Sequence, residues 1–196
     1  MANIDAKTVN ELRSRTGAGL MDCKKALVET NGDMDAAAEI LRKKGVATRD
    51  KKAGRTASQG TVASYIHMGG KIGVLVEINC ESDFVAKNEL FQGFARDVAM
   101  HIAAAAPRFL KREEVPAEEI AKETEIVKAQ CEGKPAQAIE KIVAGKLEKF
   151  YSEICLLDQP FVKDDKKTIN DLITEQITKT GENIVISRFS RFQIGA

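Results

Sequence analysis

The chain has 196 residues, which is enough for one good-sized domain or for a small domain followed by a larger one. Its apolar residues make up 43% of the chain, so it can bury a hydrophobic core, and 30 basic against 29 acidic residues give a formal net charge of +1. This balance argues against the basic field of a nucleic-acid-binding protein, and the lack of tryptophan leaves few stacking platforms for single strands.

The chain shows neither targeting nor membrane segments. Its N-terminal residues, 1–5, lack the basic and apolar regions of a signal peptide, and no apolar run approaches the roughly 18–20 residues of a membrane span. We therefore expect a cytoplasmic protein without a membrane partner. The four cysteines are scattered and form no CxxC pair, which predicts reduced, buried thiols and no zinc site. They are Cys23, Cys80, Cys131 and Cys155.

The first forty-five residues predict three short helices. Asp5 can cap the first, which stops at Gly17, and Asp33 can cap the third, for which Gly45 is the expected end. The residues expected to face inward share the spacing of one helical face: Val9, Leu12, Leu20, Cys23, Ala26, Leu27, Met34, Ala37, Ala38 and Leu41. Helices this short are not stable alone, so we expect them to pack into a three-helix domain over residues 1–46.

The pattern then changes from helical to strand-like. Residues 47–59 are rich in basic and small polar residues, and we interpret them as a solvated connector that can be partly helical. Residues 61–68 and 72–80 are strand-like and are separated by Gly69-Gly70, a hairpin turn signal. The second segment alternates apolar residues with mixed ones, as a half-buried antiparallel strand does.

A long helix is predicted over residues 88–105, with Pro107 after its end. Its expected inner face consists of Leu90, Phe91, Phe94, Ala95, Val98 and Ile102. Further helices are predicted at 116–131, 135–149 and 168–179, and a final strand at 184–194, while 153–157 is ambiguous. Helical and strand segments are segregated along the chain. We therefore expect an α+β core domain over residues 60–196, with a small antiparallel sheet packed by helices.

No motif of a known enzyme class is present: the sequence has no GxSxG, HExxH, GxxxxGK[ST] or GxGxxG. Residues 16–19 resemble part of a phosphate loop, but they lie between two predicted helices and we interpret them as a turn. His67 lies near a hairpin turn and His101 beside an apolar helical stripe, so both are expected to be packed or surface residues.

Two other chemistries stay open at this point. Glu77, Glu81 and Asp83 place three carboxylates near one strand end, where a metal hydrolase would use them, although no histidine lies near them in sequence. The basic stretch 49–55 is compatible with a nucleic-acid chaperone, whose RNA binding would depend steeply on salt.

Two longer segments are more specific. The stretches LRSRTGAGLMDCKKAL, residues 12–27, and EINCESDFVAK, residues 77–87, resemble two signature stretches of the elongation factor Ts family. Residues 159–162 and 181–189 resemble its C-terminal part, so the resemblance covers nearly the whole chain in the right order. Ser82 stands where the family pattern usually has threonine, and it keeps the hydroxyl group for capping or turn hydrogen bonds. The chain resembles the short members of the family, which have a single core subdomain.

The resemblance implies a guanine-nucleotide exchange factor for the translation GTPase elongation factor Tu, acting in protein biosynthesis by conformational coupling and not as an enzyme. Such a factor would bind Tu with GDP, perturb the Mg²⁺ and phosphate site, and promote GDP release so that GTP can bind. GDP, GTP and Mg²⁺ would be held by the partner, so this chain needs no cofactor and no nucleic acid. A homodimer giving a 2:2 complex is expected.

The same resemblance implies a wedge segment, Ser82, Asp83, Phe84 and Val85, that displaces Mg²⁺ in the partner. Phe84 would enter a pocket of the partner's nucleotide domain, and Asp83 would perturb the shell of water and side chains around the metal. Periodicity alone left Phe84 equally compatible with the core and with an interface.

A second implied contact lies in the N-terminal domain, which resembles ubiquitin-associated domains. Arg13, Gly17, Ala18, Gly19 and Met21 would dock on the nucleotide domain of Tu, whereas the neighbouring leucine is expected to pack inside. Ubiquitin-associated domains act as adaptors, so a binding module without exchange activity is an alternative. The Asp83-Phe84 pair argues against it.

Overall fold

The computed structural model describes residues 4–131, 133 and 135–195. The described chain divides into two compact units. Unit 1 comprises residues 4–62, Glu77–Ala95 and Asp171–Ser187, and unit 2 comprises Ala63–Val76, Arg96–Asn170 and residues 188–195. The predicted domain boundaries at 46 and 59 stay a prediction, and residues 1–3 and 196, at their outer ends, lie outside the described residues.

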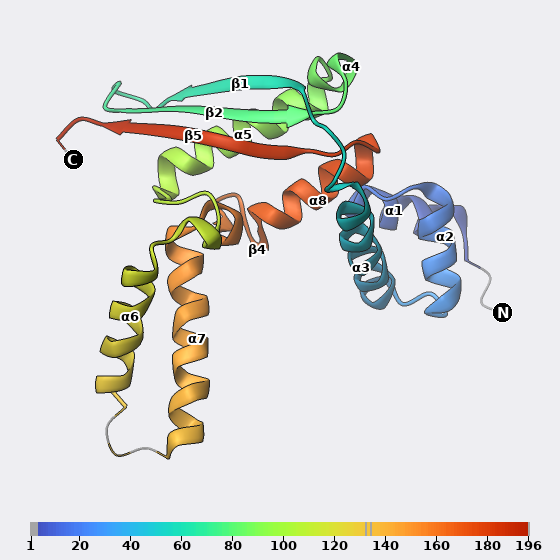
Figure 1. The fold of residues 1–196 in the computed structure, drawn as a ribbon. Coiled ribbons are helices and arrows are strands. Elements are labelled where there is room, and N and C mark those ends of the chain that lie inside the picture. The colour runs from blue at the N-terminus through green and yellow to red at the C-terminus, as the bar shows by residue number, and fades with distance from the viewer. Residues whose placement is uncertain (1–3, 132, 134, 196) are drawn as a thin grey trace. The chain divides into compact units, whose positions relative to one another are not determined.

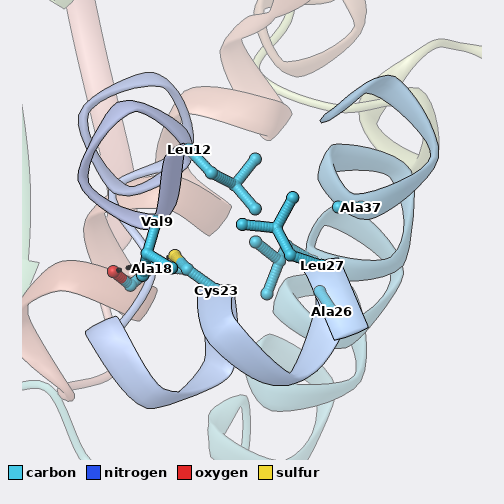
Figure 2. Close-up of a cluster of buried hydrophobic side chains, with 8 residues drawn as sticks. Val9, Leu12, Ala18, Cys23, Ala26, Leu27 and Ala37 are labelled. Atoms are coloured by element: carbon cyan, nitrogen blue, oxygen red, sulfur yellow. Dashed lines mark hydrogen bonds between the residues drawn. The ribbon is translucent and has the colours of Figure 1, made fainter. Parts of the chain in front are cut away.

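Three helices of unit 1 form a bundle at the N-terminus: α1 (Ala6–Thr16), α2 (Leu20–Glu29) and α3 (Met34–Lys52) (Figure 1). Side chains from all three helices fill its core, as Figure 2 shows for the labelled ones. The buried set is Val9, Leu12, Ala18, Cys23, Ala26, Leu27, Ala37 and Leu41. Seven of these are inward positions that helical spacing predicted, and Ala18 is added from the turn. The predicted Met34 and Ala38 are partly buried against this core.

The ends of these helices follow the predicted capping signals. The carboxylate of Asp5 accepts a hydrogen bond from the Thr8 amide at 2.7 Å, and Asp33 caps α3 in the same way. Gly17 ends α1 at φ 69°, a left-handed conformation that favours glycine.

Two details of the bundle differ from the prediction. Leu20 is 46% exposed, because Ala18 already fills the core beside the start of α2 and the first helical residue faces outward. Gly45 does not end α3, which continues to Lys52 and so includes the first residues of the predicted connector, 47–52. A Cβ at Gly45 would lie 3.1 Å from Cγ2 of Thr174 in α8 (Ile169–Thr180), so this glycine permits close packing of two helices.

Three strands form a sheet of order β1-β2-β5: β1 (Gln59–Ile66), β2 (Ile72–Cys80) and β5 (Val185–Gln193). A short turn joins β1 to β2, so these strands are antiparallel. The hydroxyl of Ser187 is hydrogen-bonded to the Asn79 side chain, and the Ile194 amide donates to the Lys71 carbonyl at 2.9 Å. Residue numbers therefore fall along β5 as they rise along β2, which makes this pair antiparallel too. The expected α+β class with a small antiparallel sheet is confirmed.

Burial alternates along β2 as predicted. Val74, Val76 and Ile78 are buried, whereas Leu75 between them is 49% exposed. One face of the strand therefore contributes to the core and the other faces solvent.

The long helix α5 (Glu89–Ala105) follows the sheet hairpin and is separated from β2 by the short helix α4 (Asp83–Ala86). Its buried face contains Phe91, Phe94, Ala95, Val98, Ala99, Ile102 and Ala103. Leu90 was expected on this face but is 43% exposed, because Phe91 takes the inward direction in the first turn.

Two helices of unit 2, α6 (Ala117–Ala129) and α7 (Ala136–Ile154), lie side by side as a hairpin (Figure 1). Helix α7 includes part of the segment whose structure the sequence left ambiguous. The guanidinium of Arg112 binds both carboxylate oxygens of Glu148 at 2.8 Å and also contacts Asp158 at 2.6 Å. These contacts lower the pKa of Glu148, through its hydrogen bonds to Arg112 first and the charge of Arg112 second.

A second sheet of two short strands was not predicted. Strands β3 (Pro160–Phe161) and β4 (Asp164–Thr168) pair antiparallel, with Pro160 opposite Thr168 and Phe161 opposite Asp164. Strand β4 has the sequence DDKKT, which carries no apolar alternation. Within the described residues, the helices are too short or too polar to cross a bilayer.

Candidate partner-binding site

The predicted wedge segment lies where β2 gives way to a single helical turn, α4. Ser82 is the N-cap of this turn, and its hydroxyl oxygen accepts a hydrogen bond from the Val85 amide at 3.3 Å. A helix of four residues is not stable on its own, because the entropy lost in forming the first turn exceeds the stabilisation from its hydrogen bonds. The cap and the contacts of the turn with unit 1 must therefore hold it.

The turn divides its side chains between the interior and solvent. Val85 and Ala86 are buried, with 6% and 7% exposure, whereas Phe84 is 79% exposed. The buried pair fixes the turn, and the neighbouring phenylalanine projects outward. The structure thus settles the position of Phe84, which periodicity had left open between core and surface.

Asp83 lies beside Phe84 on the exposed side of the turn. Its carboxylate accepts a hydrogen bond from the Lys87 ammonium at 2.8 Å, one helical turn later. This hydrogen bond, together with the positive charge of Lys87, holds the pKa of Asp83 below its ordinary value. A negative charge and an aromatic ring are therefore presented side by side at neutral pH.

A glutamate from a distant part of the chain binds the segment that leads into this turn. The carboxylate of Glu182 accepts hydrogen bonds from the Glu81 amide at 3.1 Å, the Ser82 amide at 3.0 Å and the Ser82 hydroxyl at 2.6 Å. Burial, and after it the charge of Glu182, raises the pKa of the Cys80 thiol, which donates to the Ser82 carbonyl.

The binding is reciprocal. Glu81 accepts a hydrogen bond from the Asn183 amide at 2.6 Å and lies 3.6 Å from the guanidinium of Arg55. The side-chain amide of Asn183, itself buried, donates to the Arg55 carbonyl at 2.8 Å. Two backbone loops about a hundred residues apart are thus joined by each other's glutamate.

The N-terminal residues expected to contact a partner belong to the same compact unit as the wedge segment. Arg13, Gly19 and Met21 are exposed, Met21 by 62%, whereas Ala18 is buried and Gly17 is half-buried as the C-cap of α1. Beside them on α2 is a hollow of about 310 Å³. It is lined by Met21, Lys24, Lys25, Val28 and Glu29.

Two of the three carboxylates considered for a metal site, Asp83 and Glu81, have partners within the chain. Asp83 pairs with Lys87, and Glu81 binds Asn183 and Arg55. Across the part of the chain that the structure describes, His, Cys, Asp and Glu side chains form no group of three or more that could hold a metal ion. The four cysteines are buried free thiols.

The basic stretch considered for nucleic acid lies largely on α3 and contacts unit 1 itself. The Arg49 guanidinium donates to the Thr174 hydroxyl at 3.4 Å, and the Lys52 ammonium donates to the Gly181 carbonyl. Together with the contact between Arg55 and Glu81, these bonds bring the end of α3 to the loops that support the wedge segment.

His101 is a packed residue, as expected. Its Nδ1 accepts a hydrogen bond from the Val162 amide at 3.3 Å, and its Nε2 lies 2.9 Å from the Gln159 side-chain oxygen. Burial lowers the pKa of this histidine, so the neutral ring is favoured. His67 is exposed near the β1–β2 turn, 3.2 Å from the Tyr65 hydroxyl.

Sequence comparisons with known proteins match the chain to a family. The family model described as "Elongation factor TS" matches residues 34–196. The chain belongs to the elongation factor Ts family. Proteins named "Elongation factor Ts" resemble it along its whole length: that of Anaeromyxobacter sp. (strain K) is 61% identical, with 100% of this chain and 90% of the relative covered. Those of Desulforamulus reducens and Caldanaerobacter subterraneus subsp. tengcongensis are 60% and 58% identical, covering 100% and 98% of this chain and 91% and 97% of the relatives.

Membership of the elongation factor Ts family places the chain among the factors of translation elongation. The residues matched by the family model include the wedge segment, Glu81 and Glu182. Sequence reasoning missed Glu182 and Asn183 as supports of that segment. They lie directly after the glycine that ends α8, in a stretch that resembles the family's C-terminal part, but neither signal predicts a contact between residues a hundred positions apart.

Proposed function

We propose that this chain is the guanine-nucleotide exchange factor of elongation factor Tu. It binds Tu with GDP, perturbs the Mg²⁺ and phosphate site, and promotes GDP release so that GTP can bind. The observation that carries the proposal is the 79% exposure of Phe84 on a capped, anchored turn of a member of the elongation factor Ts family. A large aromatic side chain held outward in this way is suited to entering a partner.

The task of such a factor is thermodynamic coupling. It must bind the nucleotide-free GTPase more tightly than the loaded one, and linkage then requires that it weaken nucleotide binding by the same factor. A thousandfold weakening corresponds to about 4 kcal/mol of coupling free energy, at about 1.4 kcal/mol for each tenfold. No covalent bond is made or broken, so the chain acts without being an enzyme.

Phe84 supplies part of this free energy by burial in the nucleotide domain of Tu. Fully burying a phenylalanine side chain contributes about 1.5–3 kcal/mol. Because the turn is already capped by Ser82 and anchored by Val85, little conformational entropy is lost on docking. Ser82 and Val85 therefore hold the turn in place, and Asp83 and Phe84 contact the partner.

Asp83 acts on the partner's metal site. Its carboxylate is ionised at neutral pH, as an aspartate ordinarily is, and the hydrogen bond from Lys87 lowers its pKa further. It therefore brings a negative charge toward the waters and side chains around Mg²⁺. Mg²⁺ requires nearly octahedral geometry and keeps several waters, so a small displacement of that shell weakens its hold on the phosphates. The metal and the nucleotide belong to the partner, and this chain itself needs no cofactor.

The exposed residues of the N-terminal bundle form the second contact with Tu. Arg13, Gly19 and Met21 lie at the surface, while Ala18 and Gly17 shape the turn that presents them. This contact sets the position of the factor, and the wedge segment then acts on the nucleotide site. We further propose that two chains associate as a homodimer, giving a 2:2 complex in the cytoplasm.

The test is the release of fluorescently labelled GDP from the cognate elongation factor Tu. The parent chain should accelerate release, and the double variant Asp83→Ala with Phe84→Ala should lose most of the acceleration. The matched control is Glu39→Ala with Met68→Ala. It removes a carboxylate paired with a lysine one turn later, at 2.8 Å, and a large apolar side chain that is 90% exposed.

Equal acceleration by the Asp83/Phe84 double variant and the parent would show that the wedge assignment is wrong. A parent chain that leaves GDP release unchanged would contradict the exchange function itself. The control variant should behave as the parent does, because it makes the same kinds of change at other exposed positions.

A further inference from the structure

The carboxylate of Glu182 satisfies three donors from two consecutive residues, the Glu81 amide, the Ser82 amide and the Ser82 hydroxyl. Each is a charge-assisted hydrogen bond, a kind that is shorter and stronger than a neutral one. The hydroxyl contact, at 2.6 Å, is the shortest of the three. These bonds fix the backbone immediately before α4, inside one compact unit.

The hydroxyl of Ser82 transmits this contact to the wedge segment. A serine hydroxyl has one proton to donate and two lone pairs that accept. Since the proton is given to Glu182, the oxygen presents a lone pair to the Val85 amide, 3.3 Å away. Glu182 therefore determines the direction in which the capping oxygen faces.

The loop that carries Glu182, residues 181–183, is also held by hydrogen bonds on both sides of Glu182. Glu81 accepts from the Asn183 amide at 2.6 Å, so the residue that follows Glu182 is bound by the residue that precedes Ser82. The ammonium of Lys52 donates to the carbonyl of Gly181 on the other side of Glu182. The position of the Glu182 carboxylate is thus set from both sides by the end of α3 and the end of β2.

We propose that Glu182 is a positioning residue for nucleotide exchange: through the hydroxyl of Ser82 it sets the direction in which Asp83 and Phe84 leave the surface. This inference rests on the proposed exchange function and deepens it. Glu182 does not touch the partner in this mechanism. It acts through Ser82. Its loss therefore lowers the rate at which the docked factor promotes GDP release.

The variant Glu182→Gln is the sharpest test because it keeps the shape of the side chain. A glutamine has one carbonyl oxygen, and its amide group is a donor that faces other donors here. It cannot accept from both backbone amides and the Ser82 hydroxyl with two oxygens as the carboxylate does. The matched control is Glu39→Gln, which makes the same chemical change at an exposed glutamate paired with Lys43 at 2.8 Å.

Labelled GDP release from elongation factor Tu should be followed as a function of the concentration of the full-length factor. We expect Glu182→Gln to lower the maximum rate about tenfold, the effect of about 1.4 kcal/mol. The concentration giving half of that rate should change less than about threefold, since the N-terminal contact is intact. A purely structural loss would instead reduce the active fraction and leave the remaining molecules with the parent's behaviour.

A double-mutant cycle decides whether Glu182 acts through Ser82. Ser82→Ala removes the hydroxyl alone, and its effect on the maximum rate should not add to that of Glu182→Gln, because both break the same link. Full additivity of the two effects would overturn the proposal, and so would a Glu182→Gln variant that matches Glu39→Gln in maximum rate.

Backbone amide hydrogen exchange of the free factor gives a readout that does not need the partner. Glu182→Gln should speed exchange at the Val85 amide about tenfold, and Glu39→Gln should not. Unchanged protection at Val85 would overturn the positioning role even if nucleotide exchange itself failed. If Glu182→Gln does not fold, Ser82→Ala carries the same two readouts, and parent values in both would overturn the proposal. If the parent chain does not accelerate GDP release from elongation factor Tu, only the exchange function is contradicted.

Discussion

At the scale of single residues, Phe84 stands apart from the phenylalanines that build the core. Phe91 has no exposed surface, whereas Phe84 keeps 79% of its surface in solvent. Truncating a buried phenylalanine removes its transfer free energy and leaves a cavity, which costs about 3–5 kcal/mol. Phe84 has little of either to lose, so its conformation must be kept for a purpose other than the stability of the free chain.

We therefore expect Phe84→Ala to change the free energy of unfolding by less than about 0.5 kcal/mol, the usual range for surface substitutions. Phe91→Ala should lower it by about 3–5 kcal/mol. Urea unfolding followed by circular dichroism measures both. A large loss of stability in Phe84→Ala would mean that the ring packs against the chain in solution, and the interface role would lose its support.

Residue patterns alone predicted much of this site, but not its supports. The change from strand to helix near residue 82 was visible in sequence, and it placed Asp83 and Phe84 at a junction. The sequence pattern did not decide whether Phe84 is exposed, because a single aromatic residue ahead of a helical stripe is compatible with the core and with the surface. The three bonds of Glu182 depend on how α8 and β5 return to the end of β2, and no local pattern encodes that return.

At the scale of elements, helices and strands with strong periodicity matched the prediction, and those that depend on packing did not. Strand β2 and helix α5 have long apolar stripes, and both form where predicted. Strand β4 is polar and exists only by pairing with β3. Helix α3 continues beyond its predicted end because Gly45 packs against Thr174. A glycine that locally favours a helix end here permits a close helix–helix contact instead.

Two helix-interior glycines, Gly45 in α3 and Gly93 in α5, allow this to be tested. Around Gly93 in α5 a Cβ would meet no atom within 4 Å, so Gly93→Ala should raise the free energy of unfolding by about 0.5–1 kcal/mol through helix propensity. At Gly45 the new methyl group would lie 3.1 Å from the Thr174 side chain. Overpacking costs about 1–3 kcal/mol, so Gly45→Ala should lower the free energy of unfolding despite the same propensity gain.

Urea unfolding of both variants measures the difference, and Gly45→Ala with Thr174→Ser is the decisive third variant. Removing the crowding methyl of Thr174 should restore most of the stability that Gly45→Ala loses. If Gly45→Ala stabilises the chain as much as Gly93→Ala does, α3 and α8 do not pack closely at this point in solution.

At the scale of the whole molecule, the proposed homodimer needs an apolar surface that the folded chain leaves open. The C-terminal strand and the residue after it supply exposed apolar side chains: Val185 at 40%, Phe192 at 67% and Ile194 at 73%. An interface between copies also needs about 1,000 Å² or more of buried surface, so neighbouring residues must join it.

We expect the chain to sediment at twice the 21.4 kDa of one copy, and Phe192→Asp to shift it toward a single copy. A charge buried without a partner at an interface is costly, so one such substitution should weaken association strongly. Val28→Asp is the matched control, since it places the same charge on a 48% exposed apolar residue of α2, away from the C-terminal strand in sequence. If both variants and the parent sediment as one copy, the 2:2 complex is wrong. If Phe192→Asp stays dimeric, the two chains meet through another surface.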